Sequence, residues 1–181
     1  MLSDTEQVAM NRRTLLAGFA VGLSGCASDG ESAVSEVLSS EIDTDAAEAA
    51  ILEGINAERR DRNVNDLQHA PELQTAAREH SQDMADRDFF DHTNPDGEGP
   101  EHRVGCHAGE NIYHGDRGRI QNAEDGETWQ ATNADGVAGA TIEGWTISQA
   151  HYELMIDALW RRAGVGVVVA DDEFFVTAKF C

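Results

Sequence analysis

The spacing of apolar positions predicts two helices in the first half of the chain. Apolar side chains in residues 46–62 recur at helical intervals, and Asp45 or Thr44 is expected to cap the start of that helix. Pro71 is suited to the first turn of a second helix, which is predicted to end near Phe89-Phe90. One face of this second helix carries Leu73, Ala76, Ala77, His80 and Met84. Because His80 lies on this apolar face, we interpret it as a hydrogen-bonded core histidine.

The second half of the chain changes from helical to alternating patterns. An extended segment is predicted at 109–114, followed by a surface loop at 115–135 and a helix at 137–147. Ser148 opens a further helix, which is expected to include Leu154, Met155, Ala158 and Leu159. Strands are predicted at 164–170 and 174–180. The two strands are expected to pair across the turn at Asp171-Asp172. Helices that precede a small antiparallel sheet predict an α+β fold with helices on both sides of the sheet.

The first 26 residues are typical of an export signal that ends at a lipid site. Arg12-Arg13 precede the short apolar run 15–23, which is too short to span a bilayer. The arginine pair resembles a twin-arginine signal, and Leu-Ser-Gly-Cys ending at Cys26 resembles a lipobox, in which the cysteine is acylated after cleavage. We therefore expect a protein anchored by lipid on Cys26 to the outer face of the membrane.

The chain after the signal divides into a tether and one domain. Residues 27–44 are acidic and contain few large apolar side chains, which is typical of a flexible segment. Residues 45–181 are long enough to bury a substantial core and are expected to form a single, monomeric domain.

Charge excludes several partners. The formal net charge is -21, from 34 acidic and 13 basic residues, and Lys179 is the only lysine. Such a surface repels nucleic acid and anionic lipid. Because the acidic residues are spread along the chain, we interpret them as a hydrated coat suited to a very salty medium. A surface that binds cations or basic partners is the alternative.

The cysteine count favours one disulfide bond. With Cys26 assigned to lipid, Cys106 and Cys181 remain, and an even count in an exported protein favours their pairing. Two free thiols, one of them redox-active, are the alternative, but neither cysteine belongs to a Cys-x-x-Cys pair.

Common catalytic motifs are missing from the sequence. It has no Gly-x-Ser-x-Gly, no His-Glu-x-x-His, no P-loop and no paired zinc cysteines. Five histidines stand beside turns or at the ends of predicted elements, where they could face a shared cleft. They are His92, His102, His107, His114 and His151.

Five motifs in sequence order resemble the CAP superfamily, which includes cysteine-rich secretory proteins, antigen 5 and plant pathogenesis-related 1 proteins. The motifs are Ala77-x-x-His80-Ser81-x-x-Met84-Ala85, Phe90-x-His92-Thr93-x-Pro95-x-Gly97, Gly109-Glu110-Asn111-Ile112, Trp145-x-x-Ser148-x-x-His151 and Gly164-Val165-Gly166-Val167. The resemblance covers about residues 46 to 181 and is strongest to the short bacterial and archaeal SCP domains. It implies a three-layer α-β-α sandwich with a small antiparallel sheet and a cleft lined by two histidines and two acidic residues.

Three of these four cleft positions are matched here. The resemblance assigns them to His92, Glu110 and His151, whereas Ser148 stands where the family has a second glutamate. Two imidazoles with a carboxylate suit a divalent, zinc-like ion, although three protein ligands are usual in catalytic zinc sites. If residues 109–114 are extended, His114 points the same way as Glu110 and could add to the site.

The sequence leaves three functions open. The first is a surface-anchored domain whose cleft binds a divalent metal ion, a small apolar ligand or a peptide; family members are reported to bind lipids or sterols. The second is a metal-assisted, peptidase-like hydrolase with Glu110 as base and His92 and His151 as ligands. The third is a structural envelope protein with an inert cleft.

Overall fold

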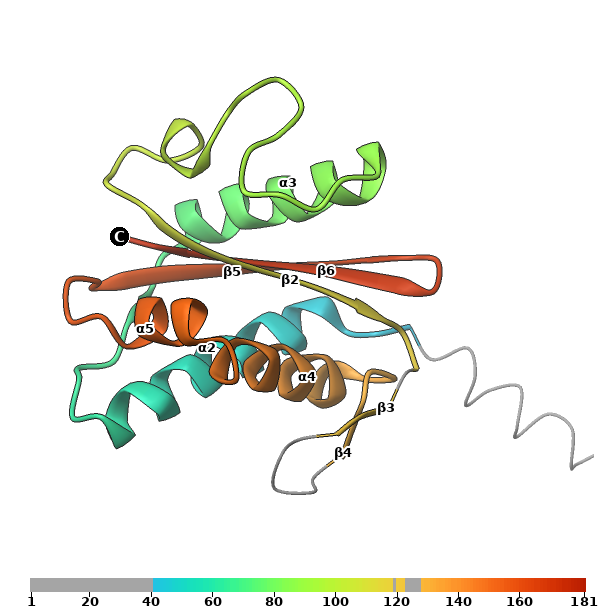
Figure 1. Ribbon diagram of the computed structural model, residues 1–181, viewed down its shortest axis with the longest axis horizontal. Coiled ribbons are helices and arrows are strands. Elements are labelled where there is room, and N and C mark those ends of the chain that lie inside the picture. Colours follow the sequence, from blue (N-terminus) through green and yellow to red (C-terminus); the bar gives the residue numbers. More distant parts are fainter. Residues whose placement is uncertain (1–40, 119, 123–127) are drawn as a thin grey trace, which may run out of the picture. The chain divides into compact units, whose positions relative to one another are not determined.

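A four-stranded sheet lies between two layers of helices (Figure 1). The computed structural model describes residues 41–118, 120–122 and 128–181. The chain divides into the units Met1–Leu38 and Ser39–Cys181, and every described residue belongs to the second. Helix α3 (Pro71–Arg87) covers one face of the sheet, and α2 (Thr44–Asp61), α4 (Ala134–Thr146) and α5 (Gln149–Ile156) cover the other. The predicted α-β-α sandwich is confirmed.

The sheet is mixed, whereas the sequence predicted an antiparallel one. Its strand order is β1-β5-β6-β2, with β1 Gln68–His69, β5 Arg162–Ala170, β6 Glu173–Phe180 and β2 Gly109–Asp116. The hairpin of β5 and β6 and the pairing of β2 with β6 are antiparallel. The short edge strand β1 pairs with β5 in the parallel direction and has no recognisable pattern of its own. Strands β1 and β2 therefore form opposite edges of the sheet.

Helix α3 packs directly on the backbone of β5. A Cβ atom at Gly164 would lie 2.0 Å from the backbone nitrogen of Gln74, and one at Gly166 would lie 2.1 Å from that of Arg78. Ser81 of α3 donates a hydrogen bond of 3.0 Å to the carbonyl oxygen of Gly166. The glycines of the Gly164-Val165-Gly166-Val167 motif thus permit this close helix–strand contact.

Helix α2 is held at both ends by side chains. Asp43 caps its start by accepting a hydrogen bond from the amide of Ala46, so the cap lies just before both predicted positions, Thr44 and Asp45. Near the other end, Arg59 is 0% exposed. Its guanidinium donates to the backbone oxygens of Asn65, Met155, Asp157 and Trp160 at 2.7 to 3.2 Å. One side chain thus ties α2 to the segment that follows α5.

The hydrophobic core contains four large aromatic residues. Trp145, Trp160, Phe174 and Phe180 are at most 5% exposed and belong to one cluster between the sheet and the α2 layer. A smaller cluster of Met84, Ile112 and Phe175 lies on the α3 side. Among the described residues, three large apolar side chains are exposed, namely Phe90, Ile147 and Leu159.

Two local predictions were wrong. Residues 115–135 were expected to form a loop, but β3 (Ile120–Asn122) and β4 (Thr128–Gln130) form a separate two-stranded sheet. Helix α5 was expected to include Leu159, but it ends at Ile156 because the backbone of Asp157 is extended. A 3-10 turn at Pro100–His102 also lies in a segment to which no element was assigned.

The predicted pairing of Cys106 with Cys181 is confirmed. Their Cα atoms are 6.1 Å apart, and the bond closes a loop across 75 positions of sequence. It joins the segment before β2 to the residue after β6. The predicted export signal and the lipid site at Cys26 lie outside the described residues. Among the residues that are described, no helix is both long and apolar enough to cross a membrane.

Candidate functional site

Three separate elements carry the predicted site residues. His92 lies in the turn after α3, Glu110 is the second residue of β2, and His151 lies in α5. The side chain of Asn94 stabilises the turn by accepting from the amides of Asp96 and Glu98 at 3.1 and 2.9 Å. The chain therefore presents His92 just outside the helix, as predicted.

Glu110 is the centre of a buried polar cluster. Its side chain is 1% exposed, and His92 Nδ1 lies 2.8 Å from its Oε1. Its Oε2 accepts from Arg103 Nη2 at 3.1 Å and from Lys179 Nζ. Both carboxylate oxygens are thus occupied by groups of the protein itself.

The neighbours of Glu110 keep it ionised. Burial alone would raise its pKa, but the hydrogen bond with His92 and the charge of Lys179 outweigh burial and lower the pKa to about 2. Burial also lowers the pKa of Lys179, which Glu110 raises in turn. The result is a buried ion pair with a second cation, Arg103, at hydrogen-bond distance.

The cluster fixes the orientation of His92. A carboxylate accepts hydrogen bonds, so Nδ1 of His92 carries the proton toward Glu110. In the neutral ring, Nε2 then holds a lone pair. None of the described residues forms a hydrogen bond with this nitrogen, and the side chain of His92 is 45% exposed.

His151 is oriented by Ser148. Its Nδ1 lies 2.8 Å from the Ser148 hydroxyl, and the side-chain amide of Asn111 donates to its backbone oxygen at 3.0 Å. Burial lowers the pKa of His151, and the nearby His92 lowers it further. The two imidazoles thus lie near enough for their charges to interact, and Ser148 contacts His151 at the position where the family has its second glutamate.

His80 Nε2 lies 3.7 Å from Oε1 of Glu110, whereas His102, His107 and His114 lie elsewhere. His114 is 3.0 Å from Glu173 and stacks on Phe175, four residues along β2 from Glu110. His107 is 3.1 Å from Glu101, and His102 accepts from the amide of Gly99. Within the described part of the chain, no group of three or more His, Cys, Asp or Glu side chains is arranged to hold a metal ion. We therefore do not place His114 in the site.

Sequence reasoning missed two members of the cluster. Lys179 lies opposite Glu110 in the register of β2 and β6, and Arg103 follows the 3-10 turn. Lys179 is the only lysine in the sequence, which could have marked it as a special residue. Its partner could not be predicted, because the register of β2 and β6 sets that contact. His80, predicted to be a core residue, is 1% exposed, with its Nε2 3.1 Å from the backbone oxygen of Asp91.

Acid is expected to destabilise the domain through His80. Burial lowers the pKa of His80 to about 4, with Glu110 raising it and Arg103 and Lys179 lowering it. In the unfolded chain, the His80 imidazole binds its proton near pH 6.5. As the pH is lowered from about 6.5 to 4, the free energy of unfolding should therefore fall by roughly 3 kcal/mol. Below this range His80 should cause no further loss. Urea unfolding across this range measures the effect. His80→Gln should flatten the profile, and equal profiles for both proteins would contradict the assignment.

The fold matches solved structures of surface and extracellular proteins. An outer surface protein of Borrelia burgdorferi matches with a TM-score of 0.62 and 18% identity, over 77% of this chain and 94% of that one. An extracellular protein containing an SCP domain from Bacillus anthracis matches with a TM-score of 0.55 and 26% identity, over 76% of this chain and 40% of that one. This chain thus spans about two fifths of the length of the Bacillus protein.

Another structural match is NaASP2, solved with Zn2+, with a TM-score of 0.54 and 14% identity, over 76% of this chain and 80% of that one. None of the curated proteins gives a significant sequence match. The family model of the cysteine-rich secretory proteins matches residues 52–180. That match includes His92, Glu110 and His151 and covers most of the chain, so the protein belongs to the cysteine-rich secretory protein (CAP) family.

Proposed function

We propose that the protein is an exported CAP-domain protein that binds a ligand at the cell surface through the imidazoles of His92 and His151. The observation that carries this proposal is that groups of the protein already bind both carboxylate oxygens of Glu110. Its side chain is 1% exposed, and its oxygens are bound by His92, Arg103 and Lys179. The two imidazoles remain the groups with which a ligand can interact.

The same observation argues against a hydrolase. A general base must come within hydrogen-bond distance of the proton that it removes. Glu110 is covered, and its low pKa makes the carboxylate a weak base. Its role is to orient His92, as carboxylates behind metal-ligating histidines do in other proteins.

The two histidines available as metal ligands suit an exchangeable metal ion better than a permanently bound one. Structural zinc sites have four protein ligands and catalytic sites usually have three, whereas His92 and His151 supply two. Glu110 accepts from Nδ1 of His92, and Ser148 contacts Nδ1 of His151. When Nδ1 of each ring carries the proton, the lone pair of each Nε2 can bind a metal ion or accept a hydrogen bond. NaASP2, which shares the fold, was solved with Zn2+. We therefore propose weak binding of a zinc-like ion, or of a small ligand that donates hydrogen bonds.

A zinc titration followed by calorimetry tests this site. His92→Ala/His151→Ala should lower the affinity at least tenfold, and Glu110→Gln, which loosens His92, by about tenfold. His102→Ala/His107→Ala is the matched control, because it removes two histidines outside the site and should leave the affinity unchanged. Equal binding by all four proteins would place the metal elsewhere. If the native protein binds no zinc, the result would favour the alternative of a structural envelope protein with an inert cleft.

A peptide and ester library tests the hydrolase alternative. We expect no turnover by the native protein with or without zinc. Turnover that disappears in Glu110→Gln, in a variant that still unfolds cooperatively, would overturn the assignment of Glu110 as an orienting residue.

Export and anchoring are proposed from the leader. Two structural matches are described as an outer surface protein and an extracellular protein. The twin-arginine sequence and the lipobox at Cys26 suit the same location. The acidic coat is proposed to keep the exported domain hydrated in a salty medium.

Metabolic labelling with a lipid precursor tests the anchor. Cells that express the native chain should yield a labelled protein in the membrane fraction. Cys26→Ser should lose the label and be released or remain unprocessed. Equal labelling and retention of both proteins would refute lipid attachment at Cys26.

A further inference from the structure

The hydroxyl of Ser148 does not play the usual part of a serine at the start of a helix. Ser148 is the N-cap residue of α5, where a serine hydroxyl ordinarily accepts a hydrogen bond from an amide of the first turn. Within the described residues no such bond forms. The hydroxyl instead lies 2.8 Å from Nδ1 of His151, and both residues are half-buried. The serine thus contacts an imidazole that a small molecule can reach.

The two neutral tautomers of His151 give this contact different roles. A hydroxyl can donate or accept, and a neutral imidazole has one N–H and one lone pair. With the proton on Nδ1, the lone pair of Nε2 is free for the ligand proposed above. With the proton on Nε2, Nδ1 accepts the hydrogen of the Ser148 hydroxyl. That second arrangement is the one found between a serine nucleophile and its base, and 2.8 Å lies within the range for such a pair.

The start of α5 places backbone donors beside the same hydroxyl. The amides of Gln149, Ala150 and His151 form no hydrogen bond with any of the described residues, and the helix's own bonds begin with the Tyr152 amide, 2.9 Å from the Ser148 oxygen. Unpaired amides and the helix dipole favour negative charge at this end of the helix. They can therefore stabilise the oxyanion that forms when Ser148 attacks a carbonyl group.

His151 lacks the support that a complete serine triad provides. In such a triad a carboxylate stabilises the imidazolium that forms during the reaction. No described residue forms a hydrogen bond with Nε2 of His151, and the carboxylate of Glu110 is bound by other groups of the protein. We therefore expect reaction only with donors that carry a good leaving group. An acyl-serine is an ordinary alkyl ester without such a leaving group, so it should persist once formed.

We propose that Ser148 is a nucleophile that takes the acyl group of an activated donor, a thioester or an aryl ester, with His151 as its base. The serine oxygen attacks the carbonyl carbon, and its proton passes to Nδ1 of His151. The bond between the carbonyl carbon and the leaving sulfur or oxygen then breaks, and the leaving group takes the proton from His151. The products are an ester at Ser148 and a free thiol or phenol. This single transfer goes beyond the ligand binding proposed for the two imidazoles, and it involves no turnover of ordinary esters or peptides.

Acylation by p-nitrophenyl acetate in the presence of EDTA tests the proposal. The native chain should release a single equivalent of nitrophenolate in a burst, and mass spectrometry after digestion should place the acetyl group on Ser148. Ser148→Ala should lose both the burst and the label. His151→Phe, which removes the base but keeps the hydroxyl, should slow labelling at least about a hundredfold. Because EDTA removes zinc, the result does not depend on metal binding at Nε2.

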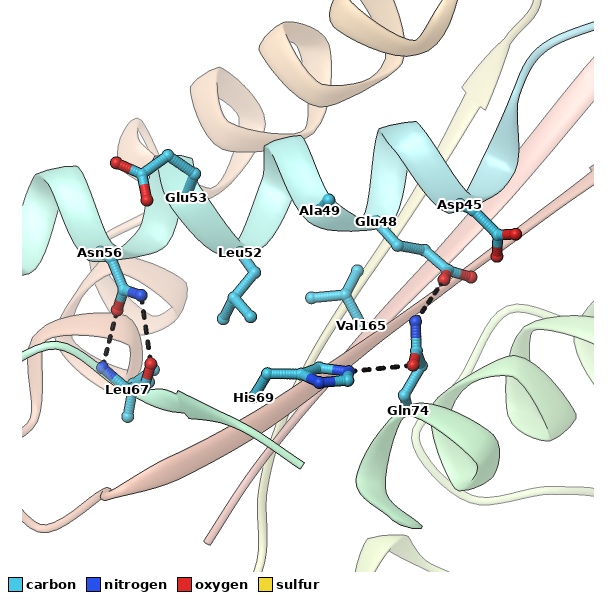
Figure 2. A pocket seen from close by; sticks show the side chains of 10 residues that line it. All are labelled: Asp45, Glu48, Ala49, Leu52, Glu53, Asn56, Leu67, His69, Gln74 and Val165. Carbon is cyan, nitrogen blue, oxygen red and sulfur yellow. Dashed lines mark hydrogen bonds between the residues drawn. The ribbon is translucent and has the colours of Figure 1, made fainter. Parts of the chain in front are cut away.

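His69 provides a matched control at the opposite edge of the sheet. It lines a cavity of about 420 Å3 between α2 and β1, where its Nε2 is 2.9 Å from the side-chain oxygen of Gln74 (Figure 2). Its partner is an amide and not a hydroxyl, so His69→Phe should leave the labelling of Ser148 unchanged. The urea-unfolded native chain should lose the selective label, because unfolding separates the serine from its base.

Three outcomes would overturn the proposal. The first is an acetyl group that lies on other residues and never on Ser148. The second is equal labelling of the native chain and His151→Phe, with cooperative unfolding of both proteins. The third is selective labelling that persists in urea, since that would reflect the ordinary reactivity of an exposed serine.

Discussion

Replacing Lys179 with methionine is expected to lower the free energy of unfolding by about 3–5 kcal/mol, because the change leaves Glu110 charged and buried without its closest cation. Lys179 is 0% exposed, and its ammonium binds Oε2 of Glu110. Arg103 and His92 remain near the carboxylate but do not replace the lost charge. Urea unfolding at neutral pH measures the effect.

The double variant Lys179→Met/Glu110→Gln is the matched control. Removing both charges relieves the unpaired carboxylate, so the double variant should be more stable than Lys179→Met alone. This outcome would show that the cost of the single change arises from the buried charge and not from altered packing. If Lys179→Met costs less than about 1 kcal/mol, the ion pair does not have the structural role assigned to it.

Replacing Arg59 with methionine should cost about 4 kcal/mol or more, because four backbone oxygens lose their hydrogen-bond donor at once. Arg59 lies entirely inside the domain and binds no carboxylate among the described residues. Methionine keeps much of the apolar stem but none of the donors. Thermal and urea unfolding both measure the loss, and hydrogen exchange should show early opening of residues 155–160.

Arg60 offers a control at the next position of the same helix. Its side chain is 46% exposed and pairs with Glu53 and Asp66. Exposed pairs contribute about 0–1 kcal/mol, so Arg60→Met should have a small effect. Similar losses in both variants would indicate a general effect on α2 in place of the specific binding of backbone oxygens by Arg59.

Local signals were sufficient for most of the fold. Pro71 marked the start of α3, and the β-branched run after Gly164 marked β5, because helix starts and buried strands depend on nearby residues. Strand β1 was missed because it is two polar residues long and pairs with Arg162 and Ala163, more than ninety positions away. Such a short edge strand has no periodicity of its own, and its pairing arises only in the folded domain.

The site was predictable only as far as the family resemblance extended. His92, Glu110 and His151 were assigned from motifs, and the structure places them on three neighbouring elements. The sequence did not indicate that Glu110 would be neutralised by Lys179, since that contact follows from the register of β2 and β6. Nor did it indicate that Ser148, in place of an acidic residue, would bond to His151. These contacts are the basis of the proposal that Glu110 orients His92 and does not act as a base.

The burial of Lys179 leaves the folded domain without an accessible side-chain amine. The sequence contains no other lysine, so amine-reactive esters have no side chain to modify while the domain stays closed. Trypsin likewise cannot reach the bond after Lys179 within β6. Acylation of that one amine, followed by mass spectrometry, therefore records each opening of the sheet and gives an unfolding rate without an introduced probe.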